Sequence, residues 1–189
     1  MMEQSKTKKE LRREVLEKRN SITVEERLRA SVMMTERLLG HQWFYLSDTI
    51  LGFAGYGSEI STDELLEEAI KMGKRVFLPR VIGEDMVFYR ILSLQDLKEG
   101  YKGIREPLGD TEVYVYDEVY TNKTLMLMPG VAFDGMRNRI GYGKGFYDRY
   151  LFDKPALQLR TIAIGFKCQK VEAIPANDND IKPYQVILF

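Results

Sequence analysis

The fold of this chain is predicted best by one stretch, Thr49-Ile-Leu-Gly-Phe-Ala-Gly-Tyr-Gly-Ser-Glu-Ile-Ser-Thr-Asp-Glu-Leu-Leu-Glu-Glu-Ala-Ile-Lys-Met-Gly-Lys-Arg-Val-Phe-Leu-Pro79. Its two ends, residues 49–53 and 75–79, are apolar runs typical of buried strands. Between them, Ser61-Thr-Asp-Glu64 has the form of a capping box, and it predicts a helix that runs to Met72 and stops at Gly73. A strand–helix–strand unit of about 30 residues is right-handed and makes its two strands parallel.

The rest of the chain supplies further elements of the same kind. Apolar runs predict strands at residues 86–91, 124–128, 160–165 and 186–188, and helices at residues 5–20, 23–40 and about 146–152. This pattern is typical of an α/β fold, with a mostly parallel twisted sheet covered by helices on both faces. We expect a Rossmann-like three-layer single domain over residues 1–189. Ligands in such folds bind beyond the carboxyl ends of the strands, where we expect the loops 54–59 and 129–145.

Three more local predictions follow from the pattern. The second helix opens with a capping box at residues 23–26, and its expected buried stripe consists of Val24, Leu28, Val32, Thr35 and Leu38 or Leu39. Residues 103–107 read as an exposed turn. His41 follows the end of the second helix, where it would interact with the C-terminal dipole.

The composition excludes several classes of function. The 28 basic and 28 acidic residues give a formal net charge of zero, which argues against general nucleic-acid binding. One cysteine, Cys168, excludes an intramolecular disulfide and a cysteine–zinc site, and one histidine, His41, excludes most histidine-based sites. The polar N-terminus lacks a signal-peptide core, and no apolar run approaches the roughly 18 residues that span a bilayer. We therefore expect a cytoplasmic protein that does not contact membranes.

The stretch Arg139-Ile-Gly-Tyr-Gly-Lys-Gly-Phe-Tyr-Asp148 carries the strongest chemical signal. Alternating glycines let a backbone approach a ligand closely, and arginine and lysine in such a loop suit phosphate. The loop is not a Walker A motif, because Lys144 is followed by Gly145, and it is not a dinucleotide fingerprint, because position 146 is Phe. The alternative is a tight turn that only joins a strand to a helix. Three glycines with Arg139, Lys144 and Asp148 exceed what a turn requires, so the loop predicts a nucleotide site.

Other candidate residues are open to two interpretations. Lys8 and Arg12 are one helical turn apart and could reach phosphates, or they form a solvated basic face. Glu59 could accept hydrogen bonds from a polar heterocycle, or it is a surface carboxylate near a helix start. Asp180 and its neighbour Asp178 could bind magnesium with Asp148, or they belong to a polar turn. Cys168 and the aromatic residues 43–45 are interpreted as packing residues.

Taken together, these motifs resemble the 5-formyltetrahydrofolate cyclo-ligase family, also called methenyltetrahydrofolate synthetases. The resemblance covers almost the whole chain in family order, with its strongest part at Arg139–Leu151. The other matching pieces are Lys8–Arg12, Ser58–Thr62, Leu78–Arg80, Gly103–Pro107, Met128–Asp134 and Asn179–Asp180. Phe146 and Ile140 stand where the family often has Tyr and Leu, so a hydroxyl at position 146 cannot be assumed.

The resemblance implies closure of 5-formyltetrahydrofolate to 5,10-methenyltetrahydrofolate, driven by ATP and Mg²⁺ through phosphorylation of the formyl oxygen, with release of ADP and phosphate. It implies ATP binding by Lys8, Lys9, Glu10, Leu11, Arg12, Arg139, Ile140, Gly141, Tyr142, Gly143, Lys144, Gly145, Phe146 and Tyr147. It implies folate binding by Arg12, Ala54, Glu59, Tyr142, Gly143, Lys144, Gly145 and Phe146. Asp148 and Asp180 would hold Mg²⁺, and Lys144 and Arg139 would be catalytic, with Lys144 stabilising the charge of the transferring phosphoryl group.

Two rival functions remain at this point. A sugar-phosphate isomerase on a related sheet would need phosphate contacts but no ATP and no metal, and the pair of Asp148 and Asp180 argues against it. A non-catalytic folate- or nucleotide-binding protein could lose Lys144, Arg139 or Asp148, yet all three are present. The expected partner is the small-molecule substrate, with no nucleic acid and no membrane, and the expected assembly is a monomer or weak homodimer.

Overall fold

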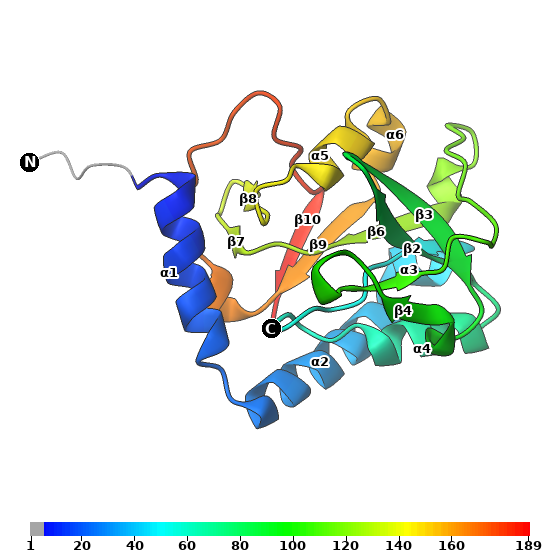
Figure 1. The fold of residues 1–189 in the computed structure, drawn as a ribbon, viewed down its shortest axis with the longest axis horizontal. Coiled ribbons are helices and arrows are strands. Elements are labelled where there is room, and N and C mark those ends of the chain that lie inside the picture. The colour runs from blue at the N-terminus through cyan, green and yellow to red at the C-terminus, as the bar shows by residue number, and fades with distance from the viewer. Residues whose placement is uncertain (1–5) are drawn as a thin grey trace, which may run out of the picture.

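A six-stranded sheet forms the centre of the computed structural model, which describes residues 6–189 (Figure 1). The strands are β1 (Thr49–Leu51), β2 (Arg75–Ile82), β3 (Asp85–Ile91), β6 (Thr124–Met128), β9 (Thr161–Gly165) and β10 (Gln185–Leu188). They lie in the order β10-β9-β6-β1-β2-β3. All neighbours are parallel except β2 and β3, which are joined by a turn at Gly83 with a φ of +63°. The predicted strand–helix–strand unit and the mostly parallel sheet are therefore confirmed.

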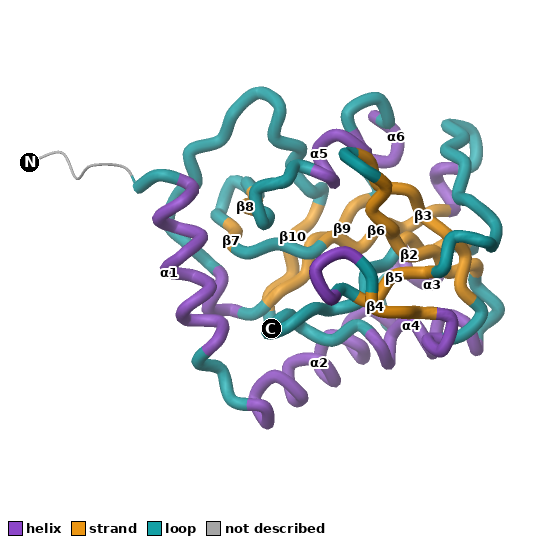
Figure 2. The backbone as a smooth tube through the Cα atoms, in the orientation of Figure 1, coloured by secondary structure: helices purple, strands orange, loops and turns teal. Residues whose placement is uncertain are grey.

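Helices cover both faces of this sheet, as Figure 2 shows. The helices are α1 (Lys8–Asn20), α2 (Val24–Leu39), α3 (Gln42–Leu46), α4 (Asp63–Lys71), α5 (Phe146–Leu151) and α6 (Pro155–Gln158). Two small hairpins lie outside the main sheet, β4 (Leu97–Glu99) with β5 (Arg105–Pro107) and β7 (Ala132–Phe133) with β8 (Arg139–Ile140). Short 3-10 helices occur at Leu94–Asp96, Tyr101–Gly103, Thr121–Lys123 and Lys167–Gln169. Within residues 6–189, no helix has the length and apolar character that crossing a bilayer would take.

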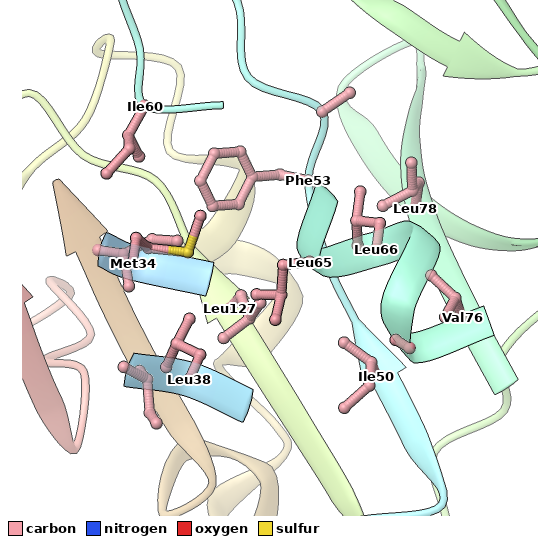
Figure 3. Packing of buried hydrophobic residues seen from close by; sticks show 14 of the residues in the cluster. Met34, Leu38, Ile50, Phe53, Ile60, Leu65, Leu66, Val76, Leu78 and Leu127 are labelled. Atoms are coloured by element: carbon pink, nitrogen blue, oxygen red, sulfur yellow. The ribbon is translucent and has the colours of Figure 1, made fainter. Parts of the chain in front are cut away.

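The larger core cluster packs α2, α3 and α4 against one face of the sheet. Alternate residues of each strand enter it, such as Ile50 of β1 and Val76 and Leu78 of β2. Figure 3 shows Leu66 of α4 beside Leu78 and Val76. Leu65 of the same helix is fully buried in this cluster. The period of two along each strand sends the intervening residues to the opposite face.

A second cluster forms on that opposite face, under α5 and α6. Leu51 and Phe77, which follow Ile50 and Val76 in their strands, pack there with Leu151 of α5 and Leu157 of α6. Both faces of the central strands are thus buried, which explains why these strands are continuous apolar runs in the sequence.

A third, smaller cluster fixes α1 at the edge of the molecule, beside the β7–β8 hairpin (Figure 1). Leu11 and Val15 of α1 pack against Ala132 and Ile140 of the hairpin. The helix begins with a capping box in which Thr7 and Glu10 exchange hydrogen bonds. Because β8 leads directly into the glycine-rich segment, this packing places α1 alongside that segment. Residue 5 of the predicted first helix lies outside the described residues.

Four local predictions need correction or refinement. In α2, Val24, Leu28 and Val32 are exposed, and Ala30, Ser31, Met34, Thr35 and Leu38 form the buried side. The small residues Ala30 and Ser31 permit close packing there, and the Ser31 hydroxyl accepts a hydrogen bond from the Ser61 N–H at 3.1 Å. The predicted buried stripe of α2 was partly wrong because apolar residues also lie on either side of the buried face of this helix.

The other three involve capping and turn residues. Thr62, rather than Ser61, caps α4, and its hydroxyl donates to the Phe53 carbonyl instead of closing a capping box. The segment 103–107 is not an exposed turn, because its last three residues form β5 and Glu106 is buried. His41 does not act at a helix C-terminus. It caps the start of α3, where its Nδ1 accepts from the Trp43 N–H at 3.1 Å.

Candidate active site

A cavity of about 490 Å³ opens at the carboxyl ends of β1 and β6, the neighbouring strands at the centre of the sheet. Its walls come from the loop after β1, the segment from Pro129 to Asp148 after β6, and helix α1. Residues of β2 and β3 and the segment 101–106 complete it. This is the edge of the sheet at which the sequence places the loops 54–59 and 129–145, so that prediction is confirmed.

The glycine-rich segment forms one wall of the cavity and connects β8 to α5. Gly143 and Gly145 have φ values of +94° and +67°, a region that residues with a side chain rarely adopt. Arg12 of α1 holds this wall, because its Nε donates to the Gly141 carbonyl at 2.8 Å. The Arg12 guanidinium also lies 3.4 Å from the point where a Cβ at position 143 would stand. The backbone conformation therefore favours glycine at positions 143 and 145, and the close approach of Arg12 favours it at position 143 as well.

Two carboxylates line the cavity, and each faces a basic side chain. Asp148 Oδ1 accepts from Arg139 Nη2 at 3.0 Å and from the Ile181 N–H at 3.1 Å. Asp180 forms an ion pair with Lys8 and accepts from the Asn177 N–H at 2.6 Å. Burial opposes the ionisation of Asp180, but the Asn177 N–H and Lys8 outweigh it and lower the pKa of this carboxyl. Since Ile181 follows Asp180 directly, these contacts bring both carboxylates to the same wall.

This donor set fits magnesium that arrives with a phosphate ligand. Within residues 6–189 no cluster of three or more His, Cys, Asp or Glu side chains is assembled. Two carboxylates are nevertheless what Mg²⁺ usually takes from a protein at a nucleotide site, where phosphate oxygens and water fill the other positions. Lys8 and Arg139 neutralise the two carboxylates in the free protein.

Arg139 and Lys144 differ in their surroundings. The Arg139 side chain is only 4% exposed and lies with its guanidinium carbon 5.7 Å from the centre of the Tyr147 ring. Its Nε is buried and has no hydrogen-bond partner among the described residues. Lys144 is exposed at the cavity wall, and its ammonium group forms no ion pair or hydrogen bond within the described part of the chain. Lys144 is therefore free to contact an anion that enters the cavity.

Glu59 lies in a second polar cluster of the cavity wall. Its Oε2 accepts from the Tyr56 N–H at 3.0 Å, and its Oε1 lies 4.0 Å from Nη1 of Arg19. Burial raises the pKa of Glu59, while the Tyr56 N–H and the charge of Arg19 act in the opposite direction. The Tyr142 hydroxyl accepts from Arg19 Nη2 at 2.6 Å, and burial raises the pKa of Tyr142 to about 12. The tyrosine is thus neutral at ordinary pH.

Most residues predicted for the site line the cavity together. They are Lys8, Arg12, Ala54, Glu59, Arg139, Ile140, Gly141, Tyr142, Gly143, Lys144, Gly145, Phe146, Tyr147, Asp148 and Asp180. Three predicted ATP contacts do not line it, namely Lys9, Glu10 and Leu11. Lys9 is exposed, Glu10 caps α1, and Leu11 packs into the third core cluster, because a helix directs successive side chains to different faces.

Two parts of the site were missed in the sequence. Arg19 lies seven residues after Arg12, two helical turns along α1, so a search for basic residues on one helix face would have found it. The segment 101–106 also lines the cavity, with Tyr101 in edge contact with Phe146 at 6.1 Å between ring centres. The family resemblance includes Gly103–Pro107, but we predicted an exposed turn there, because the position of this segment depends on the β4–β5 hairpin.

Comparisons with known proteins agree with this geometry. Residues 4–188 match the model of the 5-formyltetrahydrofolate cyclo-ligase family. The chain is 30% identical to the mouse 5-formyltetrahydrofolate cyclo-ligase over 188 residues, covering 95% of the chain and 92% of the relative. The 5,10-methenyltetrahydrofolate synthetase of Aquifex aeolicus superposes with a TM-score of 0.77 at 32% identity, over 93% of this chain and 86% of that one. The Mycoplasma pneumoniae synthetase shares the fold, with a TM-score of 0.73 at 22% identity over 95% and 97% of the two chains.

Proposed function

Because the chain belongs to the 5-formyltetrahydrofolate cyclo-ligase family and is therefore a ligase, we propose that it closes 5-formyltetrahydrofolate to 5,10-methenyltetrahydrofolate with ATP and Mg²⁺. One observation supports this proposal above all. A single cavity is lined by unpaired Lys144, by Lys8 and Arg139 with their carboxylate partners, and by the buried Glu59. Phosphate, metal and heterocycle would thus be held next to one another.

The proposed chemistry overcomes a poor leaving group. A formamide oxygen does not leave readily, so the γ-phosphoryl group of ATP is first transferred to the formyl oxygen, which releases ADP. The N10 amine of the folate then forms a bond to the formyl carbon, the carbon–oxygen bond breaks, and phosphate leaves. N10 loses its proton in the same sequence. Catalysis in such a transfer depends mainly on positioning and on charge neutralisation.

The basic residues of the cavity would bind and orient the triphosphate. Lys144 is exposed and unpaired, so it would meet the γ-phosphoryl group and stabilise the charge that develops during transfer. Arg12 already fixes the glycine-rich wall through Gly141, and the backbone N–H groups of that wall would contact phosphate oxygens. Arg139 is buried against Asp148, which suits a residue that orients its neighbours more than one that reaches into solvent.

Asp148 and Asp180 would hold the magnesium ion. When bound, Mg²⁺ supplies charge neutralisation between the β- and γ-phosphates. Lys8 pairs with Asp180 and Arg139 with Asp148, so a metal held by these carboxylates would lie beside basic side chains that can neutralise phosphate oxygens. The carboxylates would then position the metal while the basic residues neutralise the nucleotide.

Glu59 would bind the pterin side of the folate. One of its oxygens accepts from the Tyr56 N–H, and the Tyr142 hydroxyl also acts on this carboxyl by hydrogen bonding. A carboxyl group at the cavity wall would fit the N–H donors of a pterin ring. Apolar residues of the same cavity, among them Phe53, Pro79 and Met86, would cover the faces of the ring.

The proposal is tested by incubating the protein with 5-formyltetrahydrofolate, ATP and Mg²⁺ and following the near-ultraviolet absorbance of the methenyl product. We expect product only when all three components are present. Absence of product in the complete mixture would refute the proposed function. Product formed without ATP would refute the phosphoryl-transfer route, and product formed with excess chelator present would refute the requirement for Mg²⁺.

A further inference from the structure

Arg19 is a buried arginine that the proposed chemistry does not use. It lies in the last turn of α1, and its side chain is only 3% exposed. It does not line the main cavity but a small recess behind it, together with Glu59 and Gln169. A buried guanidinium is costly unless partners surround it, so its contacts indicate what it does.

The contacts of Arg19 join three parts of the site. Its Nε donates to the Ser58 hydroxyl at 3.0 Å, next to Glu59 in the loop after β1. Its Nη2 donates to the Tyr142 hydroxyl at 2.6 Å, in the glycine-rich wall. Its Nη1 is buried without a hydrogen-bond partner among the described residues and lies 4.0 Å from Oε1 of Glu59.

The distance to Glu59 is informative. At 4.0 Å the positive charge of Arg19 acts on the carboxylate without a hydrogen bond that would occupy Oε1. The Tyr56 N–H occupies Oε2, and hydrogen bonding from the Tyr142 hydroxyl also lowers the pKa of this carboxyl, so Arg19 and Tyr142 act on Glu59 together. Arg19 therefore favours the ionised form of this carboxyl through its charge, without donating a hydrogen bond to it.

The contact with Tyr142 adds a mechanical link. Arg12 holds the Gly141 carbonyl, and Arg19, two helical turns further along, holds the side chain of the next residue. Helix α1 thus holds the glycine-rich wall at two successive residues. Movement of that wall would also change the surroundings of Glu59.

From these contacts we infer that Arg19 is a positioning residue that sets the affinity for the formylfolate by acting through Glu59 and Tyr142. The inference rests on the proposed function, because it assigns Glu59 to the folate. Arg19 itself does not touch the substrate. Its removal should weaken binding of the folate and leave binding of ATP nearly unchanged.

The inference also predicts a pH dependence. The groups that face Glu59 are Arg19 from α1, Tyr142 from the glycine-rich wall and Tyr147 from α5, whose pKa is raised by burial and by the charge of Glu59. Both tyrosines are neutral at ordinary pH, so Arg19 is the one charged group of these three neighbours of Glu59. Burial already raises the pKa of Glu59, and loss of Arg19 would raise it further. As the pH is lowered, the affinity for the folate should fall in both proteins. The fall should begin at a higher pH in a variant without Arg19 than in the wild type.

The test compares Arg19→Met, which removes the charge, with Arg19→Lys, which keeps it. Dissociation constants for 5-formyltetrahydrofolate are measured by calorimetry without ATP between pH 6 and 8.5, and KM values are measured for both substrates. For Arg19→Met we expect the Kd and the KM for the folate to rise about tenfold at pH 6. A rise of about one unit in the pKa of Glu59 would cause a change of this size. The KM for ATP should change less than about twofold, which corresponds to about 0.4 kcal/mol. Arg19→Lys should restore the pH profile.

Arg13→Met is the matched control, because it removes an exposed arginine of the same helix. A role in folding alone would lower the melting temperature and the active fraction without moving Kd or its pH profile. The inference is overturned if Arg19→Met binds the folate with the wild-type pH profile, or if both substrates weaken equally. Should Arg19→Met not fold, a pH profile of Arg19→Lys that differs from the wild type would overturn it as well. Failure of the wild type to bind or convert the folate would instead overturn the proposed function.

Discussion

Replacement of Lys144 by methionine should separate catalysis from stability. The side chain is exposed at the cavity wall and has no partner within residues 6–189, so the folded protein loses no contact. A surface change of this kind alters the free energy of unfolding by less than about 0.5 kcal/mol, which is about 1–2 °C in melting temperature. The proposed phosphoryl transfer, by contrast, would lose the charge of a lysine that lines the cavity.

The size of the catalytic loss follows from the position of Lys144. Two unit charges 4 Å apart near a protein surface interact by about 4 kcal/mol, which sets an upper limit. Solvent reaches this exposed lysine and screens it, so we expect about 2–3 kcal/mol. The corresponding fall in kcat is roughly 30- to 200-fold. Because the lysine acts on the transferring group, the Kd for 5-formyltetrahydrofolate should stay within about threefold, less than 1 kcal/mol.

The assay measures kcat from the absorbance of the methenyl product, Kd by calorimetry and unfolding by thermal denaturation. Lys98→Met serves as the control, because Lys98 is an exposed lysine in β4 that does not line the cavity. A fall in kcat of less than about threefold would refute the assigned role, since it corresponds to under 1 kcal/mol. Equal losses in kcat and in folate affinity would also refute it.

Three further substitutions test the structure around the site. Arg139→Met should cost about 1–3 kcal/mol of stability, because it leaves the Asp148 carboxylate without its buried partner, and thermal denaturation measures this. Asp134→Ala should cost about 2–3 kcal/mol at pH 7 in urea unfolding, because four hydrogen bonds converge on this carboxylate. Burial opposes ionisation of Asp134, but these bonds, two of them from Asn138, lower its pKa. Its contribution is therefore present above about pH 4 and is lost as the pH falls through the lowered pKa, where variant and wild type should converge. Leu65→Ala should cost about 3 kcal/mol, or about 6–12 °C, without changing KM, because Leu65 is fully buried in the core under α4.

Local patterns were sufficient to predict the sheet. The apolar runs that became β1, β6 and β9, and residues 76–78 of β2, are buried on both faces, so no alternation was needed to recognise them. The helix α2 was predicted correctly, but Val24, Leu28 and Val32 were wrongly expected to be buried. Apolar residues flank its buried face, and only contact with Ser61 and α4 decides which of them are covered. Contacts between distant segments cannot be found from period or propensity alone.

The same limit applies to the site. The glycine-rich segment was recognisable because its residues are adjacent in the sequence, and the carboxylates because they resembled a family pattern. Arg19, in the recess behind the cavity, and Glu106, in its wall, were missed as parts of the site. Their surroundings depend on how α1 and the β4–β5 hairpin dock, and both are buried charged residues with unremarkable sequence neighbours.

The ion pair between Lys8 and Asp180 joins residues 172 positions apart in the chain. During translation, Lys8 leaves the ribosome early and its partner much later. The wall that carries Asp148 and Asp180 therefore cannot assemble until nearly all of the described chain has emerged, even though α1 and the first strands are already available. A nascent chain stalled before Asp180 would hold the glycine-rich segment and Lys144 but would lack one of the two carboxylates, so the site would be incomplete in unfinished chains.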